Sequence, residues 1–250
     1  MRFPYWIAVF GASFALAQTP DFSGVWKANP DKSKGLPQGA SMMVIIEQKD
    51  GRLTQTNGMT TQQRGEQRTA LRWDLSGKEG RGTLGGLPLK STAKWDGANL
   101  MVAVTQPKRT SSYKYSLSPD GNTLTIESAE GDRQTVAVLD KQPAEAGAAL
   151  LAPEATAEST GRYKNLKLLG SAPASSIRDT MTSWAFALGK DCNFCHVQGN
   201  FAADDKPEKA TARKMVEMAT AINKNHFGDR PQVRCFTCHQ GSSHPPQPQV

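Results

Sequence analysis

The sequence predicts a multidomain protein in which an N-terminal all-β antiparallel barrel is followed by a mainly α-helical domain. Short runs rich in β-branched residues alternate with turn signals between residues 21 and 140. Residues 141–160 are rich in Ala, Glu, Pro and Thr, and from about residue 161 apolar side chains recur at helical spacing. With 38% hydrophobic and 21% charged residues among 250, the composition is that of a folded chain rather than a disordered one.

The N-terminal segment has the features of a secretory signal peptide. Met1–Arg2 is positive, Phe3–Phe14 is almost wholly apolar, and Ala15–Ala17 fits a small-x-small cleavage site. The apolar run is shorter than the ~20 residues that span a bilayer comfortably. We therefore expect residues 1–17 to be removed and the protein to be periplasmic or otherwise exported. Membrane association is expected only through an uncleaved signal.

Residues 18–140 are predicted to form the β domain. Turn signals at Lys49–Gly51, Asp96–Gly97 and Ser118–Asn122 separate the runs by a spacing typical of an antiparallel barrel or sandwich. The clearest strand candidates are Met43–Glu47, Leu100–Thr105, Leu124–Glu127 and Thr135–Leu139.

Residues 141–160 are predicted to be a linker, although Ala148–Ala152 could form a helical turn. In the domain that follows, residues 161–241, Ser175 or Ser176 can cap a helix that ends at Gly189. Its apolar face is formed by Ile177, Met181, Trp184 and Leu188.

A second helix is predicted from Pro207 to about Asn223. Two acidic residues, Asp204 and Asp205, precede Pro207, an arrangement typical of a helix start. The Pro- and Ser-rich end, residues 242–250, is expected to be a flexible tail.

Each predicted helix is followed by a Cys-x-x-Cys-His motif. The two motifs are Cys192–His196 and Cys235–His239, and they contain all four cysteines of the chain. This pentapeptide is the attachment signature of c-type haem: the thiols bond to the haem vinyl groups and the adjacent His ligates the iron. We therefore expect two haem c groups, bound through Cys192, Cys195, Cys235 and Cys238.

Two other interpretations of the cysteines account for the motifs less completely. In a structural zinc ribbon the two cysteine pairs are usually separated by ~15–20 residues, whereas 39 residues separate Cys195 from Cys235. A zinc ribbon also does not explain why a His follows both pairs. A thioredoxin-like site needs a βαβ context, which the sequence does not contain.

His196 and His239 are expected to be the proximal iron ligands, and the sixth position decides the chemistry. Met there raises the reduction potential, a second His lowers it, and an empty position allows ligand binding or peroxide chemistry. Met181 lies eleven residues before Cys192, on the haem-facing side of the first helix. For the second haem the candidates are Met215, Met218, His226 and His244.

The region from about Tyr163 to Gly241 resembles the tetrahaem cytochrome subunit of photosynthetic reaction centres, and more closely its dihaem relatives. The matching stretches are Ala187–His196, Phe201–Pro207, Ala212–Met218 with Ala221–Asn223, and Cys235–His239. The resemblance implies that each Met ligand comes from the helix before its own motif. This points to Met181 for the first haem and to Met215 rather than Met218 for the second. We transfer no bis-His role to His226, which is offset from the corresponding loop of that family.

The N-terminal region resembles the small lipocalin-like β domains of exported bacterial proteins. The resemblance rests on Asp21–Trp26, Asn29–Ser33, Ser91–Gly97 and the run from Tyr115 to Leu124. Such barrels can hold an apolar small ligand. Trp26, Trp73 and Trp95 are expected to be core residues rather than a ligand box, and no acid–base pair, nucleophile or phosphate loop stands out.

Together these features predict an exported dihaem electron carrier, not an enzyme, with a peroxidase or other oxidoreductase as the rival. Redox proteins are the expected partners. The net charge of +7 is weak evidence for nucleic-acid binding. Four haem propionates would largely cancel the excess of positive charge in the C-terminal region, and export makes nucleic acid a less plausible partner.

Overall fold

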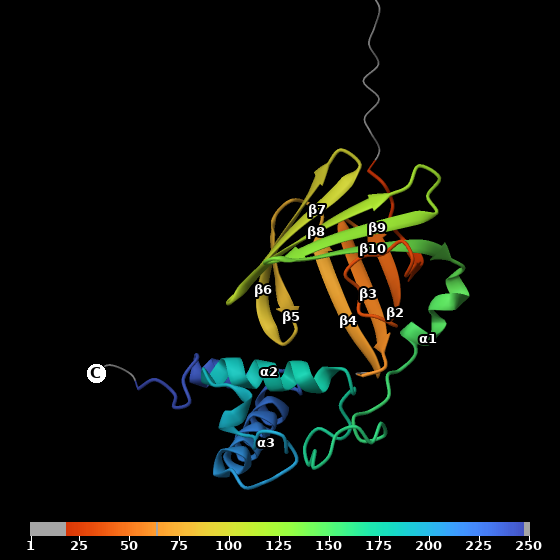
Figure 1. Cartoon of the computed structure of the whole chain (residues 1–250). Coiled ribbons are helices and arrows are strands. Elements are labelled where there is room, and N and C mark those ends of the chain that lie inside the picture. The colour runs from red at the N-terminus through yellow and green to blue at the C-terminus, as the bar shows by residue number, and fades with distance from the viewer. Residues whose placement is uncertain (1–18, 64, 248–250) are drawn as a thin grey trace, which may run out of the picture.

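The computed structural model describes residues 19–63 and 65–247. The predicted signal peptide, residues 1–17, lies outside the described residues. The described chain folds into a β-barrel and a C-terminal helical region that lies against one end of it (Figure 1). None of the described helices is both long and apolar enough to cross a membrane.

The barrel is one ten-stranded antiparallel sheet with the order β4-β3-β2-β1-β10-β9-β8-β7-β6-β5. The pairing of β1 with β10 joins the two halves of the sheet. Within the described part of the chain no ladder joins β4 to β5, so the barrel is nearly rather than fully closed. The strands are β1 (Gly24–Ala28), β2 (Ser41–Lys49), β3 (Arg52–Thr61), β4 (Gly65–Asp74), β5 (Glu79–Leu84), β6 (Leu87–Asp96), β7 (Asn99–Gln106), β8 (Arg109–Leu117), β9 (Thr123–Glu130) and β10 (Arg133–Gln142).

Large side chains occupy the interior of the barrel. Alternation along each strand sends every second residue inward, and Trp26, Trp73 and Tyr115 are fully buried. The Trp73 indole donates a hydrogen bond to the Tyr115 hydroxyl (3.0 Å), which donates to Gln55 Oε1 (2.8 Å). Burial raises the pKa of Tyr115, so this hydroxyl stays protonated. Trp26 and Trp73 are core residues as predicted, and Trp95 is half-buried and packs against the same core.

Four of the strands contain the runs that the sequence marks most clearly, β2, β7, β9 and β10. The polar strands β3 and β4 carry weaker signals, with segments such as Thr54–Gly58. They form because each pairs along its whole length with a neighbour, and context of this kind outweighs intrinsic β-propensity.

The segment predicted as a linker packs onto the barrel wall. It begins with the end of β10 and continues through η1 (Ala144–Gly147) and α1 (Ala148–Leu151). Arg68 of β4 holds this segment by donating to the carbonyl oxygens of Ala149 (3.0 Å), Leu150 (3.1 Å) and Ala152 (2.6 Å). Residues 144–152 are therefore fastened to the outside of the sheet.

The C-terminal region contains α2 (Ser176–Leu188), η2 (Cys192–Phe194), α3 (Pro207–Phe227) and α4 (Cys235–His239). Gly189 ends α2 in the left-handed conformation (φ 61°), as its position predicts. The second helix continues past Asn223 to Phe227, where Gly228 (φ 59°) ends it in the same way.

The expectation of a mainly α domain is met only in part. Long irregular stretches lie between the helices, and the chain before α2 passes through left-handed residues at Gly161, Asn165 and Lys167. Such backbone angles do not continue a helix. The region is therefore partly helical.

Candidate functional site

The first motif occupies a tight turn between α2 and α3. Asp191 caps this turn by accepting a hydrogen bond from the Asn193 amide (3.0 Å), and the His196 amide donates to the Cys192 carbonyl (3.0 Å). Cys192 is exposed and Cys195 is half-buried. The turn thus keeps both thiols and the imidazole within one short loop.

The second motif forms the short helix α4. The Arg234 amide donates to Thr237 Oγ1 (3.0 Å) at its N-terminus. Asn223 of α3 bonds to both backbone groups of Val233, donating to the carbonyl (2.8 Å) and accepting from the amide (2.9 Å). This side chain therefore fastens the approach to the second motif onto α3.

Both motif histidines are oriented in the same way. His196 Nδ1 lies 3.0 Å from the Phe201 carbonyl oxygen, and His239 Nδ1 lies 3.0 Å from the Ser242 carbonyl oxygen. A carbonyl only accepts, so Nδ1 is the donor in each of these hydrogen bonds. In a neutral imidazole with its proton on Nδ1, Nε2 has a lone pair for a metal, and such backbone contacts are the usual support of ligating histidines.

The two motifs lie side by side although 43 positions separate their leading cysteines. The Gly241 amide donates to the Ala187 carbonyl at the end of α2 (2.8 Å). The rings of Phe186 and Phe236 stack with centroids 5.3 Å apart. A side chain at Gly189 would collide with the Gly241 carbonyl, so glycine permits this approach.

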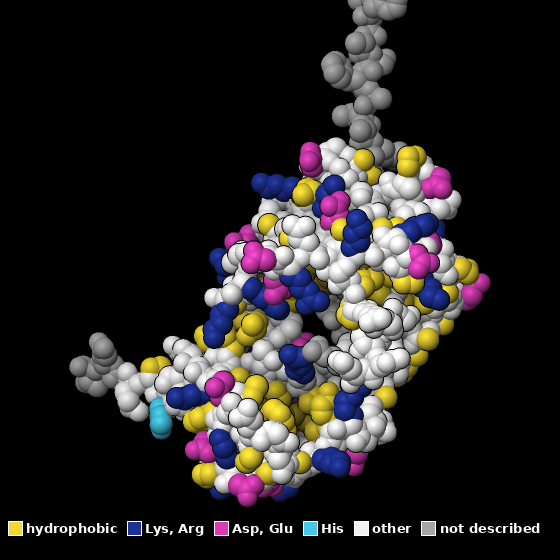
Figure 2. All heavy atoms as spheres, in the orientation of Figure 1, with side chains coloured by type: hydrophobic (Ala, Val, Ile, Leu, Met, Phe, Trp, Pro, Cys, Tyr) yellow, Lys and Arg dark blue, Asp and Glu magenta, His cyan; other side chains and the backbone are white. Residues whose placement is uncertain are grey.

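A cavity of about 860 Å³ reaches the second motif. It is lined by Cys235 and Phe236, by α2 and α3, and by the end of the barrel; Figure 2 shows the molecule hollowed where barrel and helices meet. Cys235 borders this cavity, whereas Cys238 and His239 are not among its lining residues. The two thiols of the motif, with a histidine directly after the second, suit covalent attachment of a planar macrocycle. The residues present therefore fit a haem at this motif.

The candidate axial methionines lie on the helices that the sequence predicts. Met181 of α2 is half-buried, whereas Met215 and Met218 are 39% and 47% exposed. Residues three or four positions apart are neighbours on a helix surface. Met215 is therefore a neighbour of Ala219, which lines the cavity, whereas no cavity-lining residue of α3 is spaced in this way from Met218. His226 in the last turn of α3 and His244 in the tail are exposed.

A cluster that the sequence analysis missed supports the first motif. Lys209 of α3 is only 8% exposed, and its ammonium donates to the carbonyls of Phe201 (3.0 Å), Ala202 (3.1 Å) and Ala203 (2.7 Å). The Phe201 carbonyl is the one that orients His196. The nearby Asp204 carboxylate accepts from Arg213 (2.9 Å), Lys209 (3.1 Å), Lys167 (3.1 Å) and Asn165 (2.8 Å).

The donors around Asp204 predict a pH-dependent stability. Hydrogen bonds from Arg213, Lys167 and Lys209 hold the pKa of this carboxyl far below its ordinary value of 3.8. A lowered pKa stabilises the fold above the ordinary value, and this contribution is lost as the pH falls through the folded pKa. We expect Asp204→Asn to lower the melting temperature at neutral pH, and the difference from the parent chain to shrink as the pH falls below 3.8.

Thermal unfolding of the holoprotein, followed by circular dichroism from neutral pH to about pH 2, measures this difference. Asp205→Asn is the matched control, since Asp205 is the exposed neighbouring carboxylate. A deficit in Asp204→Asn that stays constant over the whole range would contradict the prediction.

The four cysteines do not gather into one metal site. Among the described residues no three His, Cys, Asp or Glu side chains are grouped so that they could hold a metal ion. Burial raises the pKa of the Cys195 and Cys235 thiols, which favours their neutral form. The positions of the four cysteines therefore do not support the zinc-ribbon hypothesis.

Comparison with known proteins identifies the C-terminal part of the chain. Residues 116–248, just over half of the sequence, match the family described as "Photosynthetic reaction centre cytochrome C subunit". The chain is 36% identical over 100 residues to the photosynthetic reaction center cytochrome c subunit of Thermochromatium tepidum, covering 36% of this chain and 24% of that one. It is 36% identical over 61 residues to cytochrome c-554 of Chloroflexus aurantiacus, covering 22% and 15%.

The β domain was compared with solved structures. A secretory abundant heat soluble protein from Ramazzottius varieornatus is aligned over 50% of this chain and 98% of its own, with 17% identity and a TM-score of 0.39.

The present chain spans about a quarter or less of the length of the cytochromes it matches. On the extent of the family match, the chain belongs to the family of photosynthetic reaction centre cytochrome c subunits.

Proposed function

We propose that this chain is an exported dihaem c-type cytochrome that carries single electrons between redox partners. In this proposal both haems are covalently attached and each iron has His and Met ligands. The observation that carries the proposal is the shared state of the two motif histidines. Each is held at Nδ1 by a backbone carbonyl and presents Nε2 next to a Cys-x-x-Cys pair.

Different residues of the chain would attach each haem and hold its proximal ligand. Cys192 and Cys195, and Cys235 and Cys238, would hold the two macrocycles, while the carbonyls of Phe201 and Ser242 keep the proximal imidazoles in place. When bound, each haem supplies a one-electron ferric/ferrous couple whose potential depends on ligands and solvent exposure. The contact between the ends of α2 and α4 would keep the two centres close enough for electron exchange.

The partners and the compartment are also part of the proposal. Export follows from residues 1–17 as read in the sequence, and the redox partners are defined only as a donor and an acceptor of single electrons. The large buried side chains inside the barrel favour a structural role for that domain over transport of an apolar ligand.

Axial ligation is the sharpest test. We expect the holoprotein to carry two covalent haems, both six-coordinate and low-spin, with a Met-sulfur-to-ferric-iron charge-transfer band. Met181→Ala and Met215→Ala should each abolish the Met ligation of one haem and lower its reduction potential. Absorption and electron paramagnetic resonance spectra of the two variants measure this change.

Met218→Ala is the control, because Met218 lies on the same helix as Met215 but has no cavity-lining residue three or four positions away from it. Unchanged ligation in both Met181→Ala and Met215→Ala would contradict the assignment. High-spin haem with rapid peroxide turnover in the parent protein would favour the rival peroxidase function.

A further inference from the structure

The chain around the second motif carries more positive than negative charge. Residues 218–250 contain three cations, Lys224, Arg230 and Arg234, and a single carboxylate, that of Asp229. All four residues are exposed. None of the three cations takes part in a salt bridge with another residue of the described chain, 19–63 and 65–247. The positive charge of this segment is therefore not neutralised within the fold.

The loop that precedes α4 holds both arginines in fixed places. Arg230 Nε donates to the Phe227 carbonyl oxygen (3.1 Å). Arg234 Nε donates in the same way to the Pro231 carbonyl oxygen (3.1 Å). A guanidinium has five N–H donors, so each arginine keeps its terminal amino groups for a partner. Because these groups are already positioned in the free protein, binding costs less entropy.

The first motif has the opposite balance of charge. Residues 189–208 contain two lysines and four carboxylates. The hollow beside this motif is lined by Lys190 and Lys206 but also by Asp191 and Glu208. Three further cations nearby are bound to Asp204. An anion that approaches the helical region therefore meets an excess of positive charge at the second motif and not at the first.

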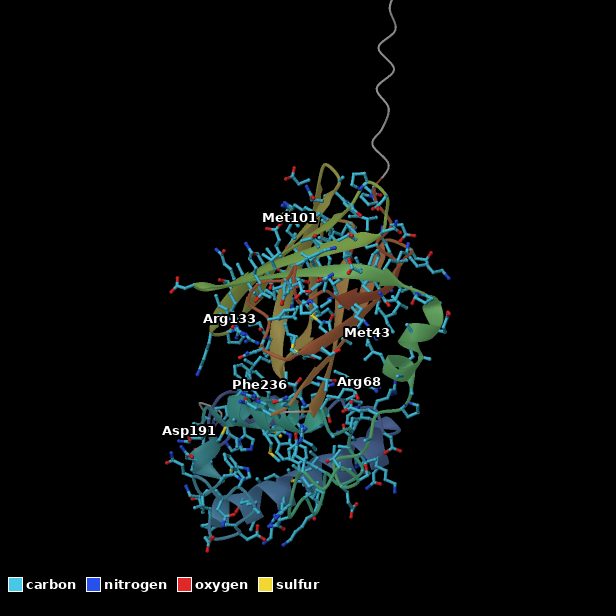
Figure 3. All side chains as sticks on the ribbon, turned by 45° about the vertical axis from the view of Figure 1, so that its right-hand side comes forward. Met43, Arg68, Met101, Arg133, Asp191 and Phe236 are labelled. Atoms are coloured by element: carbon cyan, nitrogen blue, oxygen red, sulfur yellow. The ribbon has the colours of Figure 1, made fainter. Side chains whose placement is uncertain are left out.

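The second motif also reaches the protein surface. Cys238 and the adjacent Thr237 are exposed, and the large apolar side chain of Phe236 is 47% exposed. Figure 3 shows Phe236 at the end of the helical region where Asp191 also lies. Arg234 is the N-cap residue of α4, four positions before Cys238. A group bonded to the Cys238 sulfur therefore has one edge at the surface, next to an apolar side chain and a positive rim, a composition typical of protein docking surfaces.

We propose that an acidic electron-transfer protein docks on the second motif, so that electrons enter or leave the chain through the second haem. The docking surface consists of Lys224, Arg230 and Arg234 with the exposed side chains of α4. Carboxylates on the partner are attracted to this surface, which raises the association rate and fixes the orientation of the complex. The inference rests on the proposed function, because it requires a haem at Cys235 and Cys238.

Hexacyanochromate(III) tests the surface without electron transfer, because this trianion is redox-inert and its paramagnetism broadens the resonances of nearby amides. In the ferrous holoprotein, the amides of residues 229–238 should broaden at a lower concentration of this probe than those of residues 190–196. Arg230→Gln/Arg234→Gln should raise the concentration needed at the second motif about threefold or more, and added salt should reduce this difference.

Lys164→Gln/Arg178→Gln is the matched control. It removes the same charge from two exposed residues that form no salt bridge within the described part of the chain. Arg178 lies in the first turn of α2, whereas α4 packs against the end of that helix. With 13 residues, α2 is about 20 Å long, twice the Debye length of about 10 Å at ~0.1 M salt. The control should leave the broadening unchanged, and an equal weakening in both variants would overturn the inference.

Oxidation of the ferrous holoprotein gives an independent measurement. Hexacyanoferrate(III) is an anion and tris(phenanthroline)cobalt(III) is a cation, and each takes one electron from a ferrous haem, which becomes ferric. Arg230→Gln/Arg234→Gln should slow the anionic oxidant about threefold and accelerate the cationic one, because the two respond oppositely to surface charge. A changed reduction potential would shift both rates in the same direction, so the ratio of the rates reports the surface charge. An unchanged ratio would contradict the proposal.

Two further measurements separate this inference from the proposed function. If mass spectrometry finds no haem at Cys235 and Cys238, the proposed function itself fails at this motif. Two haems without preferential broadening at the second motif would overturn the docking surface alone. Co-sedimentation with phosphatidylglycerol vesicles that is lost in Arg230→Gln/Arg234→Gln would assign the surface to an anionic membrane and not to a protein.

Discussion

Alanine at both Cys235 and Cys238 should leave a chain that carries one covalent haem instead of two. The two thioether bonds of each motif are the covalent links to its haem, and the motifs share no cysteine. The first motif has its own turn, its own histidine and its own carbonyl support at Phe201. Attachment there should therefore survive loss of the second pair.

Mass spectrometry of the denatured protein measures the haem count, and the Soret absorbance per chain should fall to about half, since two equal chromophores become one. Cys192→Ala/Cys195→Ala is the matched variant and should also carry one haem, at the other pair. The variant without all four cysteines should carry none. Retention of two haems after loss of either pair would rule out the proposed attachment.

The fold and the site differ in how far the sequence predicts them. The two motifs and the end of α2 at Gly189 can be read directly, because the chemistry of haem attachment and the left-handed glycine each depend on a few adjacent residues. The polar strands β3 and β4 cannot be read so easily, since their stability comes from pairing with neighbours rather than from their own propensity.

The contacts that support the site leave no sequence pattern. Lys209 binds backbone carbonyls, which every residue possesses, so the residue types of Phe201, Ala202 and Ala203 do not predict this contact. The contact of Gly86 with Asp179 joins residues 93 positions apart in two domains. Such a glycine can be expected to lie in a turn, but the surface it approaches depends on the tertiary structure.

Lys209→Met should destabilise the helical region by about 1–3 kcal/mol. Methionine keeps most of the apolar length of the side chain but removes the ammonium that three carbonyls accept from. Leaving a buried acceptor without a donor costs about 1–3 kcal/mol, and because the three carbonyls belong to exposed or half-buried residues that water can reach, the total loss should stay within that range. Chemical unfolding of the holoprotein, followed by the helical circular dichroism signal, measures the loss.

The same substitution distinguishes positioning from mere stability, because the Phe201 carbonyl also holds His196. Without Lys209 the loop from Phe201 to Ala203 loses its fixed place, so the ligand-field signals of the first haem should broaden or shift while those of the second, supported at Ser242, stay unchanged. Lys214→Met, an exposed lysine of the same helix, is the control and should alter neither stability nor spectrum. Equal spectral changes in both haems would mean that Lys209 stabilises the region as a whole and does not position His196.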